Sequence, residues 1–468
     1  MFMFGFREPE VLERKGLDFF EPARPKPPEK LLGLHDLIIS ARRNLLSVWP
    51  AADYRSSVGQ TRILGRQVIL VNSPESVKYV MHTRHENFER KSPQMRRALE
   101  YLLGDGLFIS DGETWKMRRP LVADIVHKNR VPTFGRTMES VTAEMVERWR
   151  TTPAGQPVNV LTEMAELTAE IIARAVFGND LGATAATEVI EGFSRYQSLI
   201  DSFNLGYFLG ADEGFPVIRG PRLRKSVKRV HKVIDKVVSD HLAGHGDHDS
   251  MIELLVRRQK RNPELGLDVN ALRNEAATIF MAGHETTAAT LTWAWYLLSN
   301  APWVEEQVLA EIEKVTGGRQ PGVADVPQLE WCRAVIEETL RLYPPVPILA
   351  RQAREADRIG NIDVDPAALA LVVPWTLHRA DDLWDRPERF MPERFLGDKR
   401  PIPYSYIPFA IGPRICAGMN FGLTESILCL AILIQRFRVR VAEGFKVEPV
   451  CRLTLRPRGG MPVTISAR

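Results

Sequence analysis

The sequence has few cysteines, and none of them stands close to another. The 468 residues include four, Cys332, Cys416, Cys429 and Cys451, and no CxxC pair. This spacing argues against a disulfide scaffold and a structural zinc site, and it is typical of a reducing compartment. We therefore expect a cytoplasmic protein in which one cysteine could still have a special role.

Long uninterrupted hydrophobic runs are also missing. Charges follow too soon after the N-terminus for a signal peptide, and His35 and Asp36 interrupt the apolar residues 31–40. One long apolar stretch, residues 276–298, carries Gly-His-Glu-Thr-Thr at its centre, which a lipid-facing helix would not tolerate. The sequence thus predicts a soluble protein without a membrane span.

A marked excess of one charge is lacking as well. Lys and Arg number 62 against 58 Asp and Glu, and the net charge of +4 is too weak to indicate a nucleic-acid-binding protein. Hydrophobic residues make up 44% of the chain and charged residues 26%, which excludes a wholly disordered or fibrous protein. We expect a globular protein with no nucleic-acid partner.

The hydrophobic pattern predicts a mostly α protein with a small β portion. Residues 61–73 place β-branched runs on both sides of Gly65, which predicts a hairpin. Helical periodicity then dominates from residue 76 to about residue 243. The polar stretch 241–251 holds three histidines, and we interpret it as a solvated loop rather than a metal site.

The second half of the chain is predicted to contain one very long helix. It runs from about residue 272 to 300 and would be ~40 Å long, enough to cross a whole domain. Another helix is predicted over residues 331–343, and a last one begins after Cys416. Because no repeat or linker is visible, we expect one α+β domain over residues 1–468, with residues 1–50 as an irregular lead-in.

The loop before the last helix carries the most chemical information. Gly412 and its following proline force a turn, and Gly418 would permit the close approach of a flat partner. Cys416 stands at the entry to an apolar helix, where backbone N–H groups stabilise a thiolate, and Arg414 offers a cation nearby. A cysteine in isolation would more often be an ordinary core residue.

The surrounding pattern favours a ligand role and resembles a known family. Five residues match the motif F-x-x-G-x-R-x-C-x-G: Phe409, Gly412, Arg414, Cys416 and Gly418. This loop resembles that of the cytochromes P-450, the haem-thiolate monooxygenases, and the likeness extends from about residue 60 to the end. It implies one triangular-prism-like domain in which haem b lies between a long distal helix and the proximal cysteine-loop helix. Cys416 would then ligate the iron.

A second motif matches the same family. Glu338 and Arg341 resemble its E-x-x-R pair, and their spacing of three places both side chains on one helix face. The alternative is a surface ion pair worth less than ~1 kcal/mol. The resemblance implies a buried pair joined by an arginine of a P-E-R-F sequence. There are two copies, and we prefer Arg394 of the second over Arg389 of the first.

The resemblance also implies a set of residues that bind the haem carboxylates. Trp115 and Arg119 resemble the W-x-x-x-R helix motif, and Arg351 aligns with another propionate-binding arginine of the family. Arg414 would serve the same purpose. The arginine fork suits carboxylates because it donates two N–H bonds and remains charged.

The long helix carries residues suited to oxygen chemistry. Its Ala-Gly-His-Glu-Thr-Thr sequence resembles the family's A-G-x-[DE]-T-[TS] motif, beginning at Ala282. We expect Gly283 to let the helix pass close to haem, and the Thr286 hydroxyl to bond back into the helix and hold dioxygen. Glu285 would relay protons through water. Thr286 and Glu285 are therefore the expected catalytic residues.

Other classes of protein fit less well. A zinc protease helix, H-E-x-x-H, would need a histidine at the position of Ala288. A haem electron-transfer or sensor protein needs no proton-relay pair such as Glu285 and Thr286. A peroxide-dependent haem peroxygenase remains as an alternative, but such relatives usually carry Arg-Pro in place of that pair.

The resemblance implies a monooxygenase that hydroxylates or epoxidises a lipophilic substrate: a fatty acid, a terpenoid or an aromatic compound. The motifs are closer to fatty-acid hydroxylases and microsomal members than to camphor-type members. Family alignment places the pocket at residues 95–108, 193–208, 280–286 and 346–350 and near Leu453.

Because only a short stretch follows Cys416, we expect no fused reductase. Electrons would come from a ferredoxin or flavodoxin and its NAD(P)H reductase. A basic patch near the Trp115 helix could attract such an acidic carrier. Its expected residues are Lys116, Arg118, Lys128 and Arg130.

Overall fold

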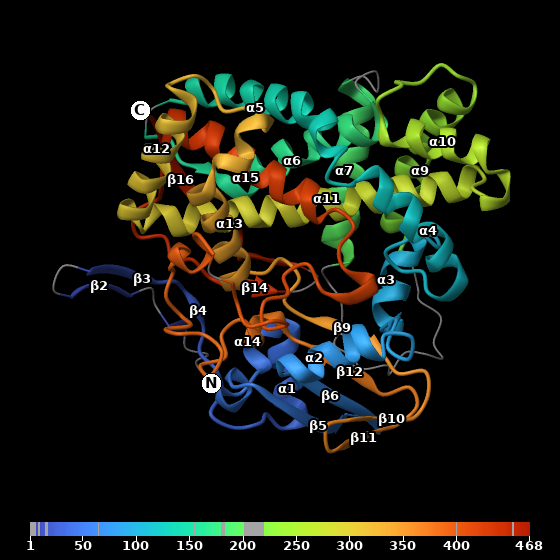
Figure 1. Ribbon diagram of the computed structural model, residues 1–468, viewed down its shortest axis with the longest axis vertical. Helices are drawn as coiled ribbons and strands as arrows, with labels where there is room; N and C mark the ends of the chain where they lie inside the picture. The colour runs from blue at the N-terminus through green and yellow to red at the C-terminus, as the bar shows by residue number, and fades with distance from the viewer. Residues whose placement is uncertain are drawn as a thin grey trace.

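Long helices form one part of the molecule and short strands with irregular segments form the other (Figure 1). The computed structural model describes residues 6–7, 10–14, 17–63, 65–153, 155–178, 183–200, 220–398, 400–451 and 454–468. Within this part of the chain helices predominate, as the hydrophobic pattern predicts.

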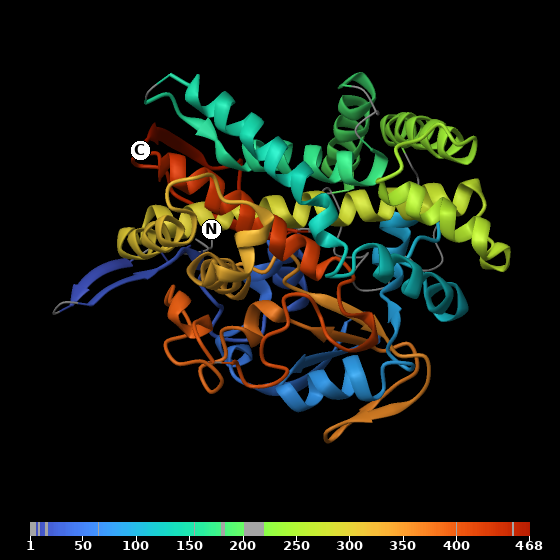
Figure 2. The same cartoon turned by 45° about the horizontal axis from the view of Figure 1, so that its top comes forward.

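Helix α11 (Val269–Ser299) organises the helical part. It crosses between the layer of α5 (Gly135–Arg150) and α6 (Val160–Phe177) and the strand-rich part of the molecule (Figures 1 and 2). The helix is buried on nearly every side, which explains its apolar sequence. Three of its threonines, Thr286, Thr290 and Thr292, donate their hydroxyls to the carbonyl four residues earlier in the helix; the Thr292 bond to the Ala288 carbonyl is 2.7 Å.

The other helices surround α11 or cover the sheet. They are α1 (Leu34–Arg43), α2 (Pro74–Lys78), α3 (Pro93–Leu103), α4 (Gly112–Ile125), α7 (Ala183–Ile200), α9 (Pro221–Leu242), α10 (Met251–Arg261), α12 (Pro302–Thr316), α13 (Glu330–Leu342), α14 (Pro374–Leu377) and α15 (Met419–Arg436). The predicted helices at 272–300, 331–343 and after Cys416 are confirmed within a few residues.

The largest sheet in the described part of the chain has the order β5-β6-β12-β9-β7. Its first two strands, β5 (Ser57–Ile63) and β6 (Arg66–Asn72), form the predicted hairpin. Strand β12 (Leu369–Val372) is parallel to β6, and β9 (Leu349–Gln352) is antiparallel to β12. Strand β7 (Arg90–Lys91) pairs with β9 in a register that sets Lys91 opposite Arg351.

Smaller strand pairs complete the structure. Strands β13 (Phe437–Val441), β16 (Pro462–Ala467) and β8 (Val158–Asn159) form one sheet. The hairpins are β10 (Asp357–Ile359) with β11 (Ile362–Val364) and β14 (Pro449–Cys451) with β15 (Leu455–Pro457).

The N-terminal region differs from the irregular lead-in that its prolines predict. Strand β1 (Phe6–Arg7) pairs with β4 (Arg24–Pro25), and β2 (Glu10–Arg14) forms with β3 (Leu17–Glu21) a hairpin that extends from the body in Figure 1. Helix α1 follows and buries Ser40 and Ala41. The prediction is wrong because strand pairing and packing on the body impose regular structure that local composition does not show.

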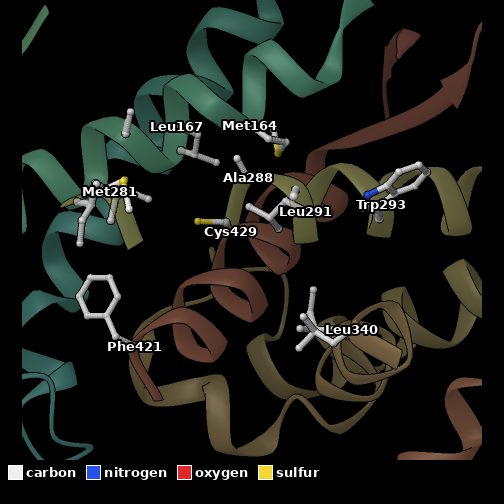
Figure 3. Packing of buried hydrophobic residues seen from close by; sticks show 14 of the residues in the cluster. Met164, Leu167, Met281, Ala288, Leu291, Trp293, Leu340, Phe421 and Cys429 are labelled. Atoms are coloured by element: carbon white, nitrogen blue, oxygen red, sulfur yellow. The ribbon is translucent and has the colours of Figure 1, made fainter. Parts of the chain in front are cut away.

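The core between α6, α11 and α15 is closely packed (Figure 3). Met164 and Leu167 of α6 face Leu291 of α11, and Cys429 of α15 lies in the same cluster. The Cys429 sulfur is 3.3 Å from the Thr142 hydroxyl, and the residue has no exposed surface. Cys429 is thus a core cysteine.

No helix in the described ranges is long and apolar enough to cross a membrane. The histidine-rich stretch is partly helical: α9 ends at Leu242 and buries His241, α10 begins at Met251, and residues 243–250 form the loop between them. Among the described residues, no group of three His, Cys, Asp or Glu side chains could hold a metal ion.

Candidate functional site

The cysteine loop has a geometry that its glycine and backbone bonds determine. The Cys416 N–H donates to the Phe409 carbonyl at 2.8 Å, which closes a turn around residues 412–414. Gly412 has φ +72°, and a Cβ atom there would lie 2.0 Å from the Met81 carbonyl oxygen. Only glycine fits this position. Apart from the chain neighbours of Gly418, no described residue has an atom within 4 Å of a Cβ built on it, so that side of the loop is open.

Cys416 has exposed surface, whereas the other three cysteines, all in the described part of the chain, are buried. Burial nevertheless raises the pKa of its thiol, while the Gly418 N–H and the nearby charges of Arg119 and Lys91 lower it. Cys416 is thus accessible and yet surrounded by protein, which indicates that its sulfur faces an inner surface of the molecule. The two cations that act on the Cys416 thiol are thus Arg119 and Lys91.

The distal segment of α11 presents a similar inner surface. Ala282 is exposed although the residues on both sides of it in the helix are largely buried. The Thr286 hydroxyl donates to the Ala282 carbonyl at 2.7 Å, so it bonds back into the helix as predicted. Burial lowers the pKa of His284 to about 4, so this side chain is a neutral core residue. The segment thus offers Ala282 and Thr286 on a partly open helix face.

Gly283 lies where α11 meets α6. A Cβ atom at this position would lie 3.0 Å from Ile172 Cδ1, so the glycine allows α11 to pack closely against α6. The sequence motif did not indicate this contact. A motif places a glycine in a helix, but only the packing shows which neighbour requires it.

Glu285 is paired with the C-terminal hairpin. Its carboxylate accepts a hydrogen bond from the Thr454 hydroxyl, and its Oε1 is 3.1 Å from Arg456 Nη2. Both partners lie near the start of β15, about 170 residues further along the chain, a separation that only the fold can bridge. Sequence reasoning assigned Glu285 a proton relay and missed these partners.

Four cations converge on the cysteine side of the site. They are Lys91, Arg119, Arg351 and Arg414. Burial, then Arg351 and Arg414, lowers the pKa of Lys91 well below its usual range. Burial, then Arg414, lowers the pKa of Arg351 to about 10. Burial also lowers the pKa of Arg119, while the Cys416 thiol raises it.

Arg414 is held from three sides. It donates to the Ser110 carbonyl at 2.9 Å, lies 3.4 Å from Glu89 and stacks over Trp115 with 4.4 Å between the guanidinium carbon and the ring centre. Its buried Nε has no hydrogen-bond partner among the described residues. Trp115 therefore orients the Arg414 guanidinium.

This cluster fits a ligand that carries carboxylates. Buried cations that lower one another's pKa are stable only if anions accompany them. Glu89 supplies one carboxylate, and haem would supply two. Lys91 was not predicted, since nothing in its local sequence distinguishes it; the β7–β9 register brings it beside Arg351. The donor set of Cys416 and these cations thus fits a haem.

The E-x-x-R residues form a separate buried cluster. Arg394 Nε is 3.4 Å from Glu338 Oε1, whereas Arg389 Nε is 3.7 Å from Glu21 and stacks on Phe19. The side chain that joins Glu338 therefore comes from the second P-E-R-F copy, as preferred from the sequence.

Part of the expected pocket and docking surface can be located. Phe193 of α7 and Phe280 of α11 pack with ring centres 4.5 Å apart, so these two predicted segments meet. Residues 201–208 and Leu453 lie outside the described residues.

The expected basic patch for an electron carrier is only partly exposed. Lys128 is exposed, but Arg118 is buried and cannot belong to a docking patch, which corrects the prediction that Arg118 contributes to it.

Comparisons with known proteins agree with this geometry. The family model "Cytochrome P450" matches residues 27–461. Cyclooctatin synthase of Streptomyces melanosporofaciens is 33% identical over 406 residues, which cover 85% of this chain and 86% of that protein. A cytokinin hydroxylase of Arabidopsis thaliana is 28% identical over 412 residues, covering 85% of this chain and 78% of its own length.

A solved structure shows the same fold. The crystal structure of the cytochrome P450DA haem domain superposes with a TM-score of 0.76 at 23% identity, covering 88% of this chain and 90% of that chain. The mostly α architecture with small sheets is therefore the fold of P450 haem domains. The chain belongs to the cytochrome P450 family and is a haem-dependent monooxygenase of that family.

Proposed function

We propose that this protein is a haem-thiolate monooxygenase in which Cys416 ligates the iron of haem b and one atom of O2 enters a lipophilic substrate. The observation that carries the proposal is the combination of an accessible Cys416 with the buried cations beside it. A thiolate and a set of carboxylate-binding cations in one site match the two ends of a haem.

The residues on the cysteine side of the site would bind the two ends of the haem. Cys416 would bind the iron, and Lys91, Arg119, Arg351 and Arg414 would bind the carboxylates. When bound, haem supplies an iron centre that activates O2. The charges of Lys91 and Arg119 lower the thiol pKa against the effect of burial, so they favour the thiolate.

Thr286 and Glu285 would transfer protons on the side of the site that faces away from Cys416. The Thr286 hydroxyl donates to the Ala282 carbonyl, and its oxygen can accept a hydrogen bond from water at the open helix face. Glu285 is one residue away, and Thr454 and Arg456 fix its carboxylate. Glu285 would relay protons through water toward the Thr286 hydroxyl.

We infer a terpenoid-like substrate. The names of two relatives specify a carotene and the unsaturated alcohol cyclooctat-9-en-7-ol as compounds they oxidise. Spin-state titration of the Soret band with terpenoids and with fatty acids of equal carbon number tests this choice.

The iron ligand is tested by four serine variants. Cys416→Ser should abolish the red-shifted Soret band of the reduced carbon monoxide complex, because an alcohol does not replace the thiolate donor. Cys332→Ser, Cys429→Ser and Cys451→Ser should retain that band, since all three residues are buried core cysteines. If the Cys416 variant keeps the band, the proposed function is wrong.

We also propose an acidic electron carrier, a ferredoxin or flavodoxin, that docks beside α4. Lys128 is exposed there, and Lys116 pairs with Glu113 at 2.9 Å. Lys128→Glu should slow reduction at low salt and weaken its salt dependence. Lys314→Glu on α12 is the control, since Figure 1 places α12 and α4 at opposite sides of the molecule. Equal rates in the two variants would exclude this docking site.

A further inference from the structure

Arg118 lies inside the protein and connects a loop to two helices. Its Nη1 and Nη2 donate to the two carboxylate oxygens of Asp105 at 2.9 and 2.8 Å, and Nη1 also reaches the Asp105 carbonyl at 2.8 Å. The same Nη1 donates to Glu275 Oε1 of α11 at 3.1 Å. Only 8% of the Arg118 side chain and 1% of the Glu275 side chain are exposed. This is a two-point ion pair with a second, buried carboxylate attached.

Glu275 and its neighbour hold the loop backbone directly. Both carboxylate oxygens of Glu275 accept from the Leu107 N–H, at 3.0 and 3.2 Å. The Asn274 side-chain amide donates to Asp105 Oδ1 at 2.9 Å. The loop is thus tied to α11 through its main chain and through its acidic side chain, which leaves it little freedom to move sideways.

Two glycines allow the loop to lie directly on α11. A Cβ on Gly104, which has φ +55°, would lie 2.1 Å from the Asn274 amide nitrogen. A Cβ on Gly106 would lie 2.1 Å from the Thr278 hydroxyl. Thr278 stands one helical turn before Ala282, so the loop touches α11 where its partly open segment begins.

The other end of the loop reaches the cation cluster. Lys91 Nζ lies 3.2 Å from the centre of the Phe108 ring, and the Ser110 carbonyl accepts from Arg414 at 2.9 Å. Residues 104–110 therefore connect the groups that would bind the haem carboxylates with the distal helix. A shift of this loop would move both sides of the site together.

We propose that Asp105, Arg118 and Glu275 form a clasp that fixes residues 104–110 as a wall of the site, and that these three are positioning residues for haem retention and for ligand access. The inference rests on the proposed function for the identity of the cofactor. The clasp itself depends only on the contacts between the loop, α4 and α11.

The experiment compares Asp105→Asn and Glu275→Gln with the unaltered holoenzyme. Each amide keeps the size of the acid but removes an acceptor. In Glu275→Gln the new NH2 group would oppose the Leu107 N–H in either orientation of the amide, because both carboxylate oxygens accept from that N–H. We would measure hydrogen exchange of residues 104–110, carbon monoxide association after photolysis, and haem transfer to apomyoglobin. Glu144→Gln is the control, because Glu144 pairs with Arg174 at 2.8 Å on a half-exposed surface away from the loop.

Glu275→Gln should exchange the Leu107 amide about tenfold faster or more, the factor expected for loss of a hydrogen bond to a charged group. Asp105→Asn should speed exchange of the loop because the two-point ion pair with Arg118 is lost. Carbon monoxide association and haem transfer should also accelerate, and Arg118→Lys should lie between the unaltered enzyme and the clasp variants. Unchanged loop exchange would overturn the clasp. Faster exchange with unchanged carbon monoxide and haem rates would overturn its positioning role. The Soret band of the unaltered enzyme tests the proposed function separately.

Discussion

Arg341 and Glu338 form a two-point ion pair inside α13, with Nε to Oε2 at 2.7 Å and Nη2 to Oε1 at 2.8 Å. Neither side chain has exposed surface. The Met391 N–H also donates to Glu338 Oε1, at 2.8 Å, and Arg394 lies beside it. The carboxylate is therefore satisfied by two cations and one backbone donor, as a buried charge requires.

The remaining donors of Arg341 bind the irregular segment that leads to the cysteine loop. They reach the carbonyls of His378, Pro387 and Arg389 at 2.8, 2.6 and 3.0 Å. This segment has little regular structure, so its shape depends on these bonds. The E-x-x-R pair thus holds the segment that leads to the cysteine loop and is not itself part of the site.

The first prediction concerns this pair. Arg341→Met should destabilise the protein by about 3–5 kcal/mol, because it leaves Glu338 as a buried, poorly compensated charge. Arg333→Met is the control: Arg333 pairs with Glu337 on the same helix at 3.5 Å and is partly exposed, so its loss should cost less than about 1 kcal/mol. Urea unfolding of both variants gives the comparison. Similar losses in the two variants would contradict a special role for the buried pair.

The second prediction concerns the cation cluster. Lys91→Met removes one of several buried cations that repel one another, so the haem-free protein should become more stable. The same change should speed haem transfer to apomyoglobin, because one carboxylate partner is lost. Thermal unfolding of the haem-free protein should thus show a gain in stability while the transfer rate shows a loss of haem retention.

Arg358→Met serves as its control, since Arg358 is an exposed cation of β10, and neither quantity should change. If haem transfer from the Lys91→Met variant is slower or unaltered, Lys91 does not bind the haem carboxylates.

The third prediction concerns Thr286 and Glu285. Thr286→Ala should still bind haem and consume reduced cofactor, but release more hydrogen peroxide and less product, because the hydroxyl that orients the proton donor is lost. Thr290→Ala, one turn later, removes a hydroxyl that donates to the Thr286 carbonyl and should keep normal coupling. Cofactor oxidation, peroxide and product are measured in one assay.

Glu285→Gln should slow turnover, because an amide cannot relay protons. Normal coupling in Thr286→Ala, or normal turnover in Glu285→Gln, would show that another group delivers the proton.

The fourth prediction concerns pH. Burial raises the pKa of Glu275 from 4.5 to about 7, against the opposing effects of Arg118 and the Leu107 N–H, while Asp105 adds to the rise. The folded state therefore binds the carboxyl proton of Glu275 more tightly than the unfolded state does. This difference adds on the order of 3 kcal/mol to the free energy of unfolding below about pH 4.5, and the contribution is lost as the pH rises through about 7.

Melting temperatures at pH 5, 6, 7 and 8 test this effect. The unaltered protein should lose stability with rising pH relative to Glu275→Gln, which carries no titratable group at this position. Parallel pH curves for the two proteins would mean that Glu275 keeps an ordinary pKa.

Motifs within single helices or turns could be predicted from the sequence. The spacing of Glu338 and Arg341 places them on one helix face, and the Thr286 hydroxyl bonds to a carbonyl four residues earlier. The turn before Cys416 follows from Gly412. These features depend on helix periodicity and local backbone geometry, which a few neighbouring residues determine.

Contacts between distant segments could not be predicted in this way. Lys91 joins the site through strand register, Glu285 pairs with Arg456 across the fold, and Arg118 points into the protein instead of toward an electron carrier. The local motifs, and through them the family and its chemistry, follow from the amino-acid order alone. Which side chains face one another follows from the folded chain, because strand register and helix packing depend on contacts between residues far apart in the sequence.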